Sequence, residues 1–200
     1  MRVSRIQAAE NRQTVIDVAS RLFRENGFDG IGLKDLMEAA GLTQGAFYKQ
    51  FASKDDLQAQ ASRRAMESAF GRWSAAAEAN PKDPLGAVIA FYLSMAHREE
   101  RGDGCPVVAL GSDAARQGVD VKASFEAGIR KYLEMLGGWI GEPDGEDSSG
   151  KAMAILSTMV GALVLSRAVN NKLLSKRFLQ AAAKDVLARS SASDAATRTD

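Results

Sequence analysis

The chain has 200 residues, and its 26 Lys and Arg residues nearly balance its 25 Asp and Glu residues. Its hydrophobic content of 46% is ordinary for a soluble globular protein of one or two domains. This composition excludes a uniformly basic chain, but it is compatible with a local basic patch. The single cysteine, Cys105, excludes an internal disulfide and fits a reducing compartment, so the sequence predicts a cytoplasmic protein.

The first 57 residues show the apolar spacing of short helices. Apolar residues at 15, 18, 19, 22 and 23 share one helix face, and this helix is expected to end at Gly27. A second helix is predicted over about 33–40, with Gly41 as its stop. Thr43 is the expected N-cap of a third helix running from about 44 to 51. Ser53 is the expected N-cap of a long fourth helix that reaches about residue 79.

The remainder of the chain also predicts helices. The segment NPKDP at 80–84 ends the fourth helix, because proline interrupts helical hydrogen bonding. Further helices are expected at about 85–100, 106–117, 119–139, 150–171 and 176–189, with a loop at 137–150 and a disordered polar tail at 190–200. The apolar stretch at 152–166 is too short for a membrane span and is expected to be a buried helix. The sequence predicts an all-α fold of roughly nine helices, divided into a three-helix domain at 1–53 and a larger bundle at 54–189.

The second and third predicted helices form a helix-turn-helix pattern, in which the later helix enters the major groove of DNA. That helix is too short to be stable alone, so Phe47 and Phe51 are expected to hold it against its neighbours. The residues expected to face DNA are small, polar or basic: Lys34, Thr43, Gln44, Gly45, Ala46, Tyr48, Lys49, Lys54 and, in a basic N-terminal arm, Arg5. Spacing alone leaves an ordinary protein surface as an equal alternative.

The stretch VIDVASRLFRENGFDGIGLKDLMEAAGLTQGAFYKQFASKDDL at 15–57 resembles the DNA-binding domain of the TetR/AcrR family of bacterial repressors. The resemblance implies a homodimer whose C-terminal helical domain at 54–189 dimerises and binds a small-molecule effector, with a double-stranded DNA operator as the partner. Gly32 departs from the pattern, because the family usually has Thr or Ser at this helix cap. One phosphate contact expected from the resemblance is therefore in doubt.

The predicted helix at 150–171 is apolar nearly all round, which requires cover on two sides. One side can face its own bundle and the other a second subunit, and the resemblance implies a four-helix dimer interface with the following helix. The expected interface residues are Leu156, Val160, Leu163, Val164, Phe178, Leu179, Ala182 and Val186. A large monomeric core is the alternative.

Apolar and aromatic residues recur along the helices between these two regions, and such a lining suits a hydrophobic or aromatic effector. The candidate effector residues are Met66, Phe70, Trp73, Phe91, Tyr92, Met95, Cys105, Tyr132 and Met135. Ordinary core packing is the more frequent reason for such spacing. His97 has no Cys or carboxylate partner at ligand spacing, so neither a metal nor a cofactor is expected.

Cys105 precedes Pro106 and is expected at or beside a helix N-cap, where a thiolate is stabilised. A repressor that senses oxidants or electrophiles through Cys105 is therefore one alternative function, although a buried apolar role is the more frequent one. A helical partner-binding protein without DNA function is a second alternative. An enzyme is not expected, because no oxyanion loop, phosphate cradle or carboxylate pair accompanies Cys105 and His97.

Overall fold

The computed structural model describes residues 4–140 and 146–196. Its described residues form ten α-helices and no strand, which confirms the all-α prediction. The helix expected over 85–100 is two helices, α5 (Pro84–Tyr92) and α6 (Met95–Glu99), which raises the number from nine to ten. The Ser94 hydroxyl accepts a hydrogen bond from the His97 amide at 3.0 Å, so a new N-cap starts α6.

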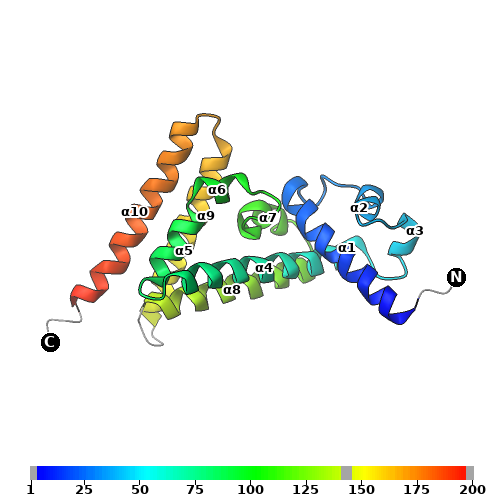
Figure 1. The fold of residues 1–200 in the computed structure, drawn as a ribbon, viewed down its shortest axis with the longest axis horizontal. Coiled ribbons are helices and arrows are strands. Elements are labelled where there is room, and N and C mark those ends of the chain that lie inside the picture. Colours follow the sequence, from blue (N-terminus) through cyan, green and yellow to red (C-terminus); the bar gives the residue numbers. More distant parts are fainter. Residues whose placement is uncertain (1–3, 141–145, 197–200) are drawn as a thin grey trace. The chain divides into compact units, whose positions relative to one another are not determined.

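The chain forms two compact units, and two long helices contribute residues to both (Figure 1). Unit 1 contains residues 1–69 and 101–128, and unit 2 contains residues 70–100 and 129–200. The helices α4 (Lys54–Ala79) and α8 (Val119–Ile140) cross from one unit to the other. Unit 1 therefore holds more than the predicted helix-turn-helix segment, because it also includes residues 101–128.

Unit 1 is built around α1 (Arg5–Asn26), which packs on α2 (Leu33–Ala39) and on α7 (Pro106–Ala114). The chain leaves α1 at Gly27, whose φ of 80° is a conformation that favours glycine, as predicted. Immediately beyond it, the Phe28 amide donates to the Asp113 carboxylate of α7 at 3.3 Å. Side chains with less than 2% exposure fill the interior of this unit, among them Val15, Ala19, Phe23, Phe28, Leu36, Met37, Phe47 and Leu57.

Arg24 joins α1 to the segment that precedes α7. Its side chain is buried, and it donates to the carbonyl oxygens of Ser20 at 2.9 Å and Gly104 at 3.0 Å. A buried guanidinium is costly unless hydrogen-bond acceptors surround it, and these two carbonyls supply that compensation. The segment 101–105 is thereby held against α1.

Unit 2 contains the pair α9 (Glu146–Ala168) and α10 (Lys172–Ala196), which lie side by side (Figure 1). Their bounds correct the sequence prediction, because α9 starts within the expected 137–150 loop and α10 continues into the expected disordered tail at 190–200. Residues 141–145 and 197–200 of those two segments lie outside the described residues.

Two arginines join α6 to the C-terminal end of α9. Arg98 donates to the Ser166 carbonyl at 3.0 Å, while Arg167 donates to the carbonyls of Arg98 and His97, each at 3.0 Å. The last carbonyls of a helix have no partner within it, and a cation there also complements the helix dipole. Each arginine therefore satisfies the end of the other's helix and fixes where α6 meets α9.

Within the described residues, one helical stretch, Gly150–Ala168, is long and apolar enough to cross a membrane by length and composition. This stretch of 19 residues is longer than the apolar run at 152–166 on which the sequence prediction of a buried helix was based. Core helices of soluble proteins meet the same criterion, and Ala152, Ile155, Met159 and Leu163 of this helix are buried inside the protein.

Candidate nucleic-acid interface

The turn before α3 (Gln44–Phe47) is fixed by two backbone hydrogen bonds at the end of α2. The Leu42 amide donates to the Met37 carbonyl at 2.9 Å, and the Gly41 amide donates to the Glu38 carbonyl at 2.9 Å. This pairing is a Schellman motif, and it requires the left-handed φ of 72° found at Gly41. The glycine stop thus sets the direction in which the chain enters α3.

The α3 helix buries one face and exposes the other. Phe47 is 1% exposed and Phe51 is 4% exposed, and their rings stack at a centroid distance of 5.4 Å. Tyr48, between them, is 70% exposed, with its ring edge against Phe47. The helical part of this segment is shorter than the predicted 44–51, because residues 48–50 form a turn.

The exposed face of this segment, here called the α3 face, consists of Thr43, Gln44, Gly45, Tyr48 and Lys49. Thr43 occupies the N-cap position of α3, but its hydroxyl makes no capping hydrogen bond, contrary to the prediction. The hydroxyl therefore remains available to a phosphate or a base. Ala46, the other small residue predicted here, is half-buried.

The fold of the chain does not itself require a glycine at position 45. A Cβ atom built at this position would meet no atom within 4 Å, and the backbone φ lies outside the left-handed region. A side chain at position 45 would extend from the exposed α3 face. The absence of a side chain at this exposed position would let another molecule approach the backbone closely, which is the prediction for a helix that lies in a DNA groove.

Three basic residues that were predicted to contact DNA lie outside the α3 face, and their surroundings differ. Lys34 is exposed and lies 3.8 Å from Glu38 on the same helix. The Lys54 ammonium donates to the Ile31 carbonyl at 3.2 Å, so it also holds the segment that leads into α2. Arg5, predicted in a basic N-terminal arm, is exposed and is the first residue of α1. Each of the three remains a predicted phosphate contact.

Gly32 is the N-cap of α2, as predicted, and it makes no side-chain capping bond. The Ser53 cap is also confirmed, because the Ser53 hydroxyl accepts from the Asp56 amide at 3.0 Å. The first turn of α4 therefore has a side-chain acceptor for a free backbone amide, whereas the first turn of α2 has none from its N-cap residue.

The predicted effector residues divide between the two units, and three of them form a packed aromatic cluster. Trp73, Tyr92 and Tyr132 are at most 2% exposed. The centroid of the Trp73 ring lies 4.5 Å from that of Tyr132 and 5.6 Å from that of Tyr92. These three side chains form a packed aromatic cluster in unit 2. Phe70 joins it through Tyr132 at 4.8 Å. The remaining predicted residues of this unit, Phe91, Met95 and Met135, are half-buried, whereas Met66 and Cys105 belong to unit 1.

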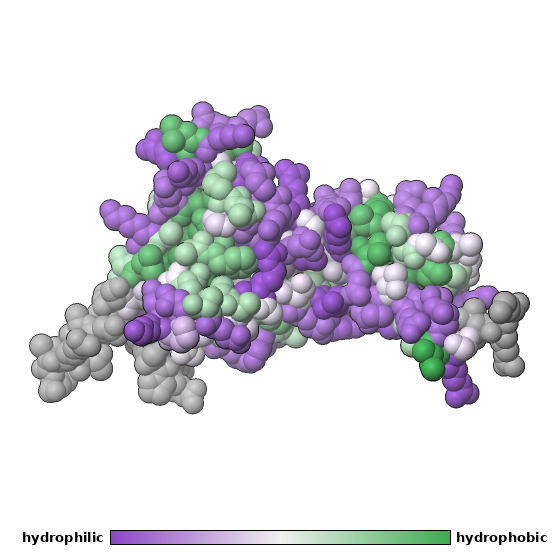
Figure 2. Space-filling view, viewed as in Figure 1, coloured by the Kyte–Doolittle hydropathy of each residue, from purple (hydrophilic) through white to green (hydrophobic). Residues whose placement is uncertain are grey.

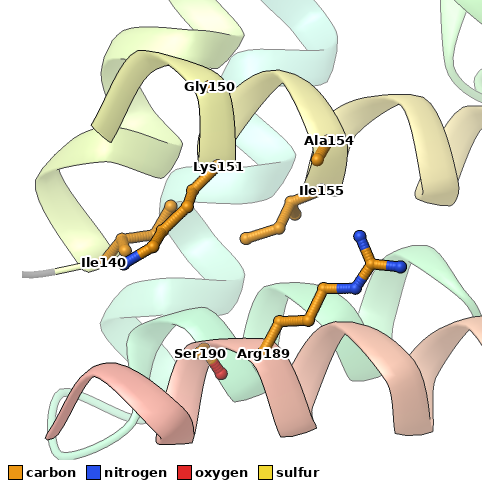
Figure 3. Close-up of a pocket in the computed structure, with 7 residues that line it drawn as sticks. All are labelled: Ile140, Gly150, Lys151, Ala154, Ile155, Arg189 and Ser190. Carbon is orange, nitrogen blue, oxygen red and sulfur yellow. The ribbon is translucent and has the colours of Figure 1, made fainter. Parts of the chain in front are cut away.

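A cleft of about 540 Å³ lies elsewhere in unit 2, between the start of α9 and the end of α10 (Figure 3). Ile155 and Arg189 come from opposite helices that line it, and Lys151 extends toward Ile140 (Figure 3). None of the predicted effector residues is among the side chains that line this cleft. Arg189 is also paired with Asp185 at 2.8 Å.

The predicted dimer-interface residues differ in how exposed they are within the single chain. Five of the eight expected interface residues are buried within the single chain: Leu156, Leu163, Leu179, Ala182 and Val186. Their side chains are largely covered by the packing of the single chain. Val164 is 43% exposed, and Val160 and Phe178 are half-buried, so these three remain candidates.

The outward face of α9 carries Val164 together with four residues that were not predicted, and this set is here called the α9 outer face: Met153, Ser157, Gly161, Val164 and Leu165. These residues recur at helical spacing along one side. A Cβ atom at Gly161 would meet nothing within 4 Å. Figure 2 shows apolar side chains gathered over the part of the view where α5, α9 and α10 lie.

Cys105 is the N-cap residue of α7, and Pro106 occupies the first turn, as predicted. The thiol makes no capping hydrogen bond, and the residue is 2% exposed. Because oxidants and alkylating reagents need access to the sulfur, this burial favours a core role for Cys105 over a sensor role.

His97 is buried, and its Nδ1 lies 2.7 Å from the Tyr92 carbonyl. Burial lowers the pKa of His97, while the hydrogen bond to Tyr92 opposes that shift. No group of three or more potential metal ligands occurs among the described residues.

Residues 15–61 match the family model described as bacterial regulatory proteins, tetR family. The AcrR regulator of Shigella flexneri is 35% identical over 104 residues, which cover 50% of this chain and 48% of AcrR. The NemR repressor of Escherichia coli K12 is 22% identical over 130 residues, which cover 64% of this chain and 65% of NemR. The chain thus spans about half the length of AcrR and less than two thirds of NemR.

The fold is similar over nearly the whole chain to solved regulators. The reduced form of E. coli NemR superposes with a TM-score of 0.73 at 19% identity, covering 88% of this chain and 95% of NemR. A TetR-family regulator from Cytophaga hutchinsonii gives 0.77 at 20% identity, covering 94% of this chain and 98% of that protein. A segment that matches the tetR-family model therefore lies near the N-terminal end of a chain whose fold is similar to those of solved TetR-family regulators.

Proposed function

We propose that the protein is a ligand-responsive transcriptional regulator: a cytoplasmic homodimeric repressor that a small hydrophobic or aromatic effector releases from a palindromic operator. The α3 face carries this proposal, because it exposes Gln44, Tyr48 and Lys49 around a glycine that the fold itself does not require. Gln44 suits an adenine edge, and Tyr48 and Lys49 suit phosphates. The relatives it matches are named as transcriptional regulators, and we propose no enzymatic activity.

The test of DNA binding compares Tyr48→Ala and Lys49→Ala with the wild type on a duplex selected from random DNA. We expect each variant to bind at least about tenfold more weakly, because each loses a contact in both subunits of a dimer. Lys82→Ala is the matched control, since Lys82 is an exposed lysine outside the α3 face. Fluorescence anisotropy at several salt concentrations measures both affinity and salt slope.

The wild-type salt slope is expected to have a magnitude of about 4 to 6 per dimer, which corresponds to two or three neutralised phosphates per subunit. Lys49→Ala should lower it by about 2 if each subunit loses one phosphate contact. A wild-type protein that enriches no duplex over random DNA would contradict the proposed function and favour a helical protein that binds another partner.

Dimerisation is proposed through the α9 outer face. Gly161 and Ser157 allow a second helix to approach closely, and an isologous contact brings the two copies of this face together. A twofold dimer then places its two α3 helices about one DNA turn apart, or a multiple of that distance. The half-site spacing of the selected duplex therefore reports on the dimer.

Gly161→Arg is expected to raise the dimer dissociation constant at least about 100-fold, because two arginines would oppose each other across the twofold axis. Sedimentation velocity over a concentration series measures this constant. Gly71→Arg is the matched control, since Gly71 also lies in a helix with open space around its Cβ position. Equal dissociation constants for the wild type and Gly161→Arg would show that the subunits meet elsewhere.

Release by the effector follows from thermodynamic linkage. An effector that binds one dimer geometry more tightly lowers the affinity of the protein for DNA, and bound DNA lowers the affinity for the effector by the same factor. The aromatic cluster of Trp73, Tyr92 and Tyr132 supports a hydrophobic or aromatic effector, with Phe70 and Met135 as further candidates. An effector at this cluster must separate rings that are in contact in the structure.

Thiol sensing by Cys105 is the second candidate function, supported by its N-cap position and opposed by its burial. We expect the folded protein to react with iodoacetamide at least about 100-fold more slowly than the urea-unfolded chain, because the sulfur is inaccessible. Mass spectrometry of timed samples gives both rates. A folded-state rate equal to the unfolded one would support sensing, and Cys105→Ser would then show whether the electrophile response depends on this thiol.

A further inference from the structure

The α3 segment depends on contacts from outside itself. Only Gln44–Phe47 is helical, and so short a helix is not stable in isolation. Its buried side is held by Phe47 and Phe51. At its C-terminal end, the amides of Gln50 and Phe51 both donate to the Phe47 carbonyl, at 2.8 and 3.0 Å. The carbonyl of Gln50 itself lies beyond this turn, where helix ends leave acceptors without an internal partner.

Arg12 of α1 supplies the contact at this point. Its Nε donates to the Gln50 carbonyl at 3.3 Å, and its guanidinium carbon lies 4.9 Å from the centroid of the Phe51 ring. Arg12 is half-buried, and no carboxylate pairs with it among the described residues. One planar side chain therefore holds both the backbone and the aromatic anchor at the end of the α3 segment.

We propose that Arg12 is a positioning residue for DNA recognition, which fixes the α3 face so that Gln44 and Tyr48 meet their bases and phosphates in one orientation. This inference rests on the proposed DNA-binding function. The competing role for Arg12 is a direct phosphate contact, since no ion pair among the described residues neutralises its charge.

Two features of the geometry favour positioning. The hydrogen bond is donated by Nε, which lies in the plane of the guanidinium that lies over Phe51. Lysine has no planar group and therefore cannot make both contacts in this way. The cation–π contact also requires the guanidinium to lie over Phe51, which buries part of the group against the protein. Both contacts exist in the protein without DNA, as positioning requires.

The test uses the full-length variants Arg12→Lys and Arg12→Gln, with Arg21→Gln as the matched control. Arg21 lies on the same helix with an exposed side chain that is paired with Glu25. Affinities for the selected duplex and for random DNA are measured against salt by fluorescence anisotropy. The decisive quantity is the ratio of the two affinities, since loss of a phosphate contact weakens binding to both kinds of DNA alike.

If Arg12 positions α3, both Arg12→Lys and Arg12→Gln should lower the specificity ratio about tenfold and leave the salt slope on random DNA unchanged. Arg21→Gln should leave the ratio unchanged. The alternative result would be that Arg12→Lys binds like the wild type, while Arg12→Gln lowers the salt slope by about 2 per dimer and leaves the specificity ratio unchanged. That result would show that Arg12 contacts phosphate and that the inference is wrong.

A measurement without DNA separates this inference from the proposed function. Hydrogen exchange of peptides covering 43–53 should be about tenfold faster in Arg12→Gln than in the wild type, while peptides from α4 beyond residue 57 should be unchanged. Exchange at the wild-type rate would overturn the tether itself. If exchange accelerates but the wild-type protein prefers no DNA sequence, the tether exists and the DNA-binding proposal has failed.

Discussion

Phe47→Ala is expected to lower the free energy of unfolding by about 3–5 kcal/mol, as for large aromatic side chains removed from a core. Phe47 is 1% exposed and contacts the rings of both Tyr48 and Phe51. Because four helical residues cannot re-form a packed face alone, the lost ring leaves a cavity between α3 and its neighbours. Urea denaturation followed by circular dichroism measures the change.

Tyr48→Ala is the matched control for this stability effect. Its side chain is 70% exposed, so truncation should change the free energy of unfolding by no more than about 0.5 kcal/mol. Both variants should bind the selected duplex poorly, Phe47→Ala because α3 is no longer held and Tyr48→Ala because a contact is missing. Equal stabilities for Phe47→Ala and the wild type would mean that α3 does not depend on this aromatic anchor.

Gly45→Leu is expected to reduce operator affinity at least about 1000-fold, to the level of non-specific binding. The leucine side chain would extend from the exposed α3 face and keep the helix from approaching the base edges. The fold should tolerate it, because no atom of the chain lies within 4 Å of the new Cβ and leucine is a better helix former than glycine.

Gly45→Ala separates the two effects further. It should stabilise the protein by roughly 0.5–1 kcal/mol, since glycine loses more backbone freedom on folding, and still weaken operator binding. Gly71→Leu is the control, because Gly71 is a second exposed helical glycine with open space around it. Operator binding by Gly45→Leu at the wild-type level would place the DNA contact elsewhere on unit 1.

The sequence alone was sufficient for the helix-turn-helix pattern, because its signals are local. Gly41 is needed where the backbone adopts a positive φ, and Phe47 and Phe51 are four residues apart and so share one side. Thr43 shows the limit of such reasoning. Its residue type predicts a capping bond, but its hydroxyl makes none, because the orientation of that side chain is not fixed by residue type.

Periodicity identified α9 as a helix that needs cover on two sides, but it could not say which side faces its own chain. Leu156 and Leu163 were assigned to a second subunit, and the tertiary structure buries both inside unit 2. An all-apolar helix has no polar face to mark its exposed side. The same limit applies to Trp73, Tyr92 and Tyr132, whose spacing fits a lined cavity and a packed cluster equally well.

The sequence by itself therefore determined the helical fold, the helix-turn-helix segment and the glycine stop on which that segment depends, since each follows from short-range spacing and backbone geometry. Only the tertiary structure placed Arg12 on the Gln50 carbonyl, 38 residues away, and Arg24 on the Gly104 carbonyl, 80 residues away. Every residue has a backbone carbonyl, so the sequence does not show which carbonyl will accept a hydrogen bond from a distant arginine. An arginine that donates to a carbonyl therefore cannot be told by sequence from an arginine at the surface. These long-range contacts depend on how the helices pack, and packing is a property of the whole chain.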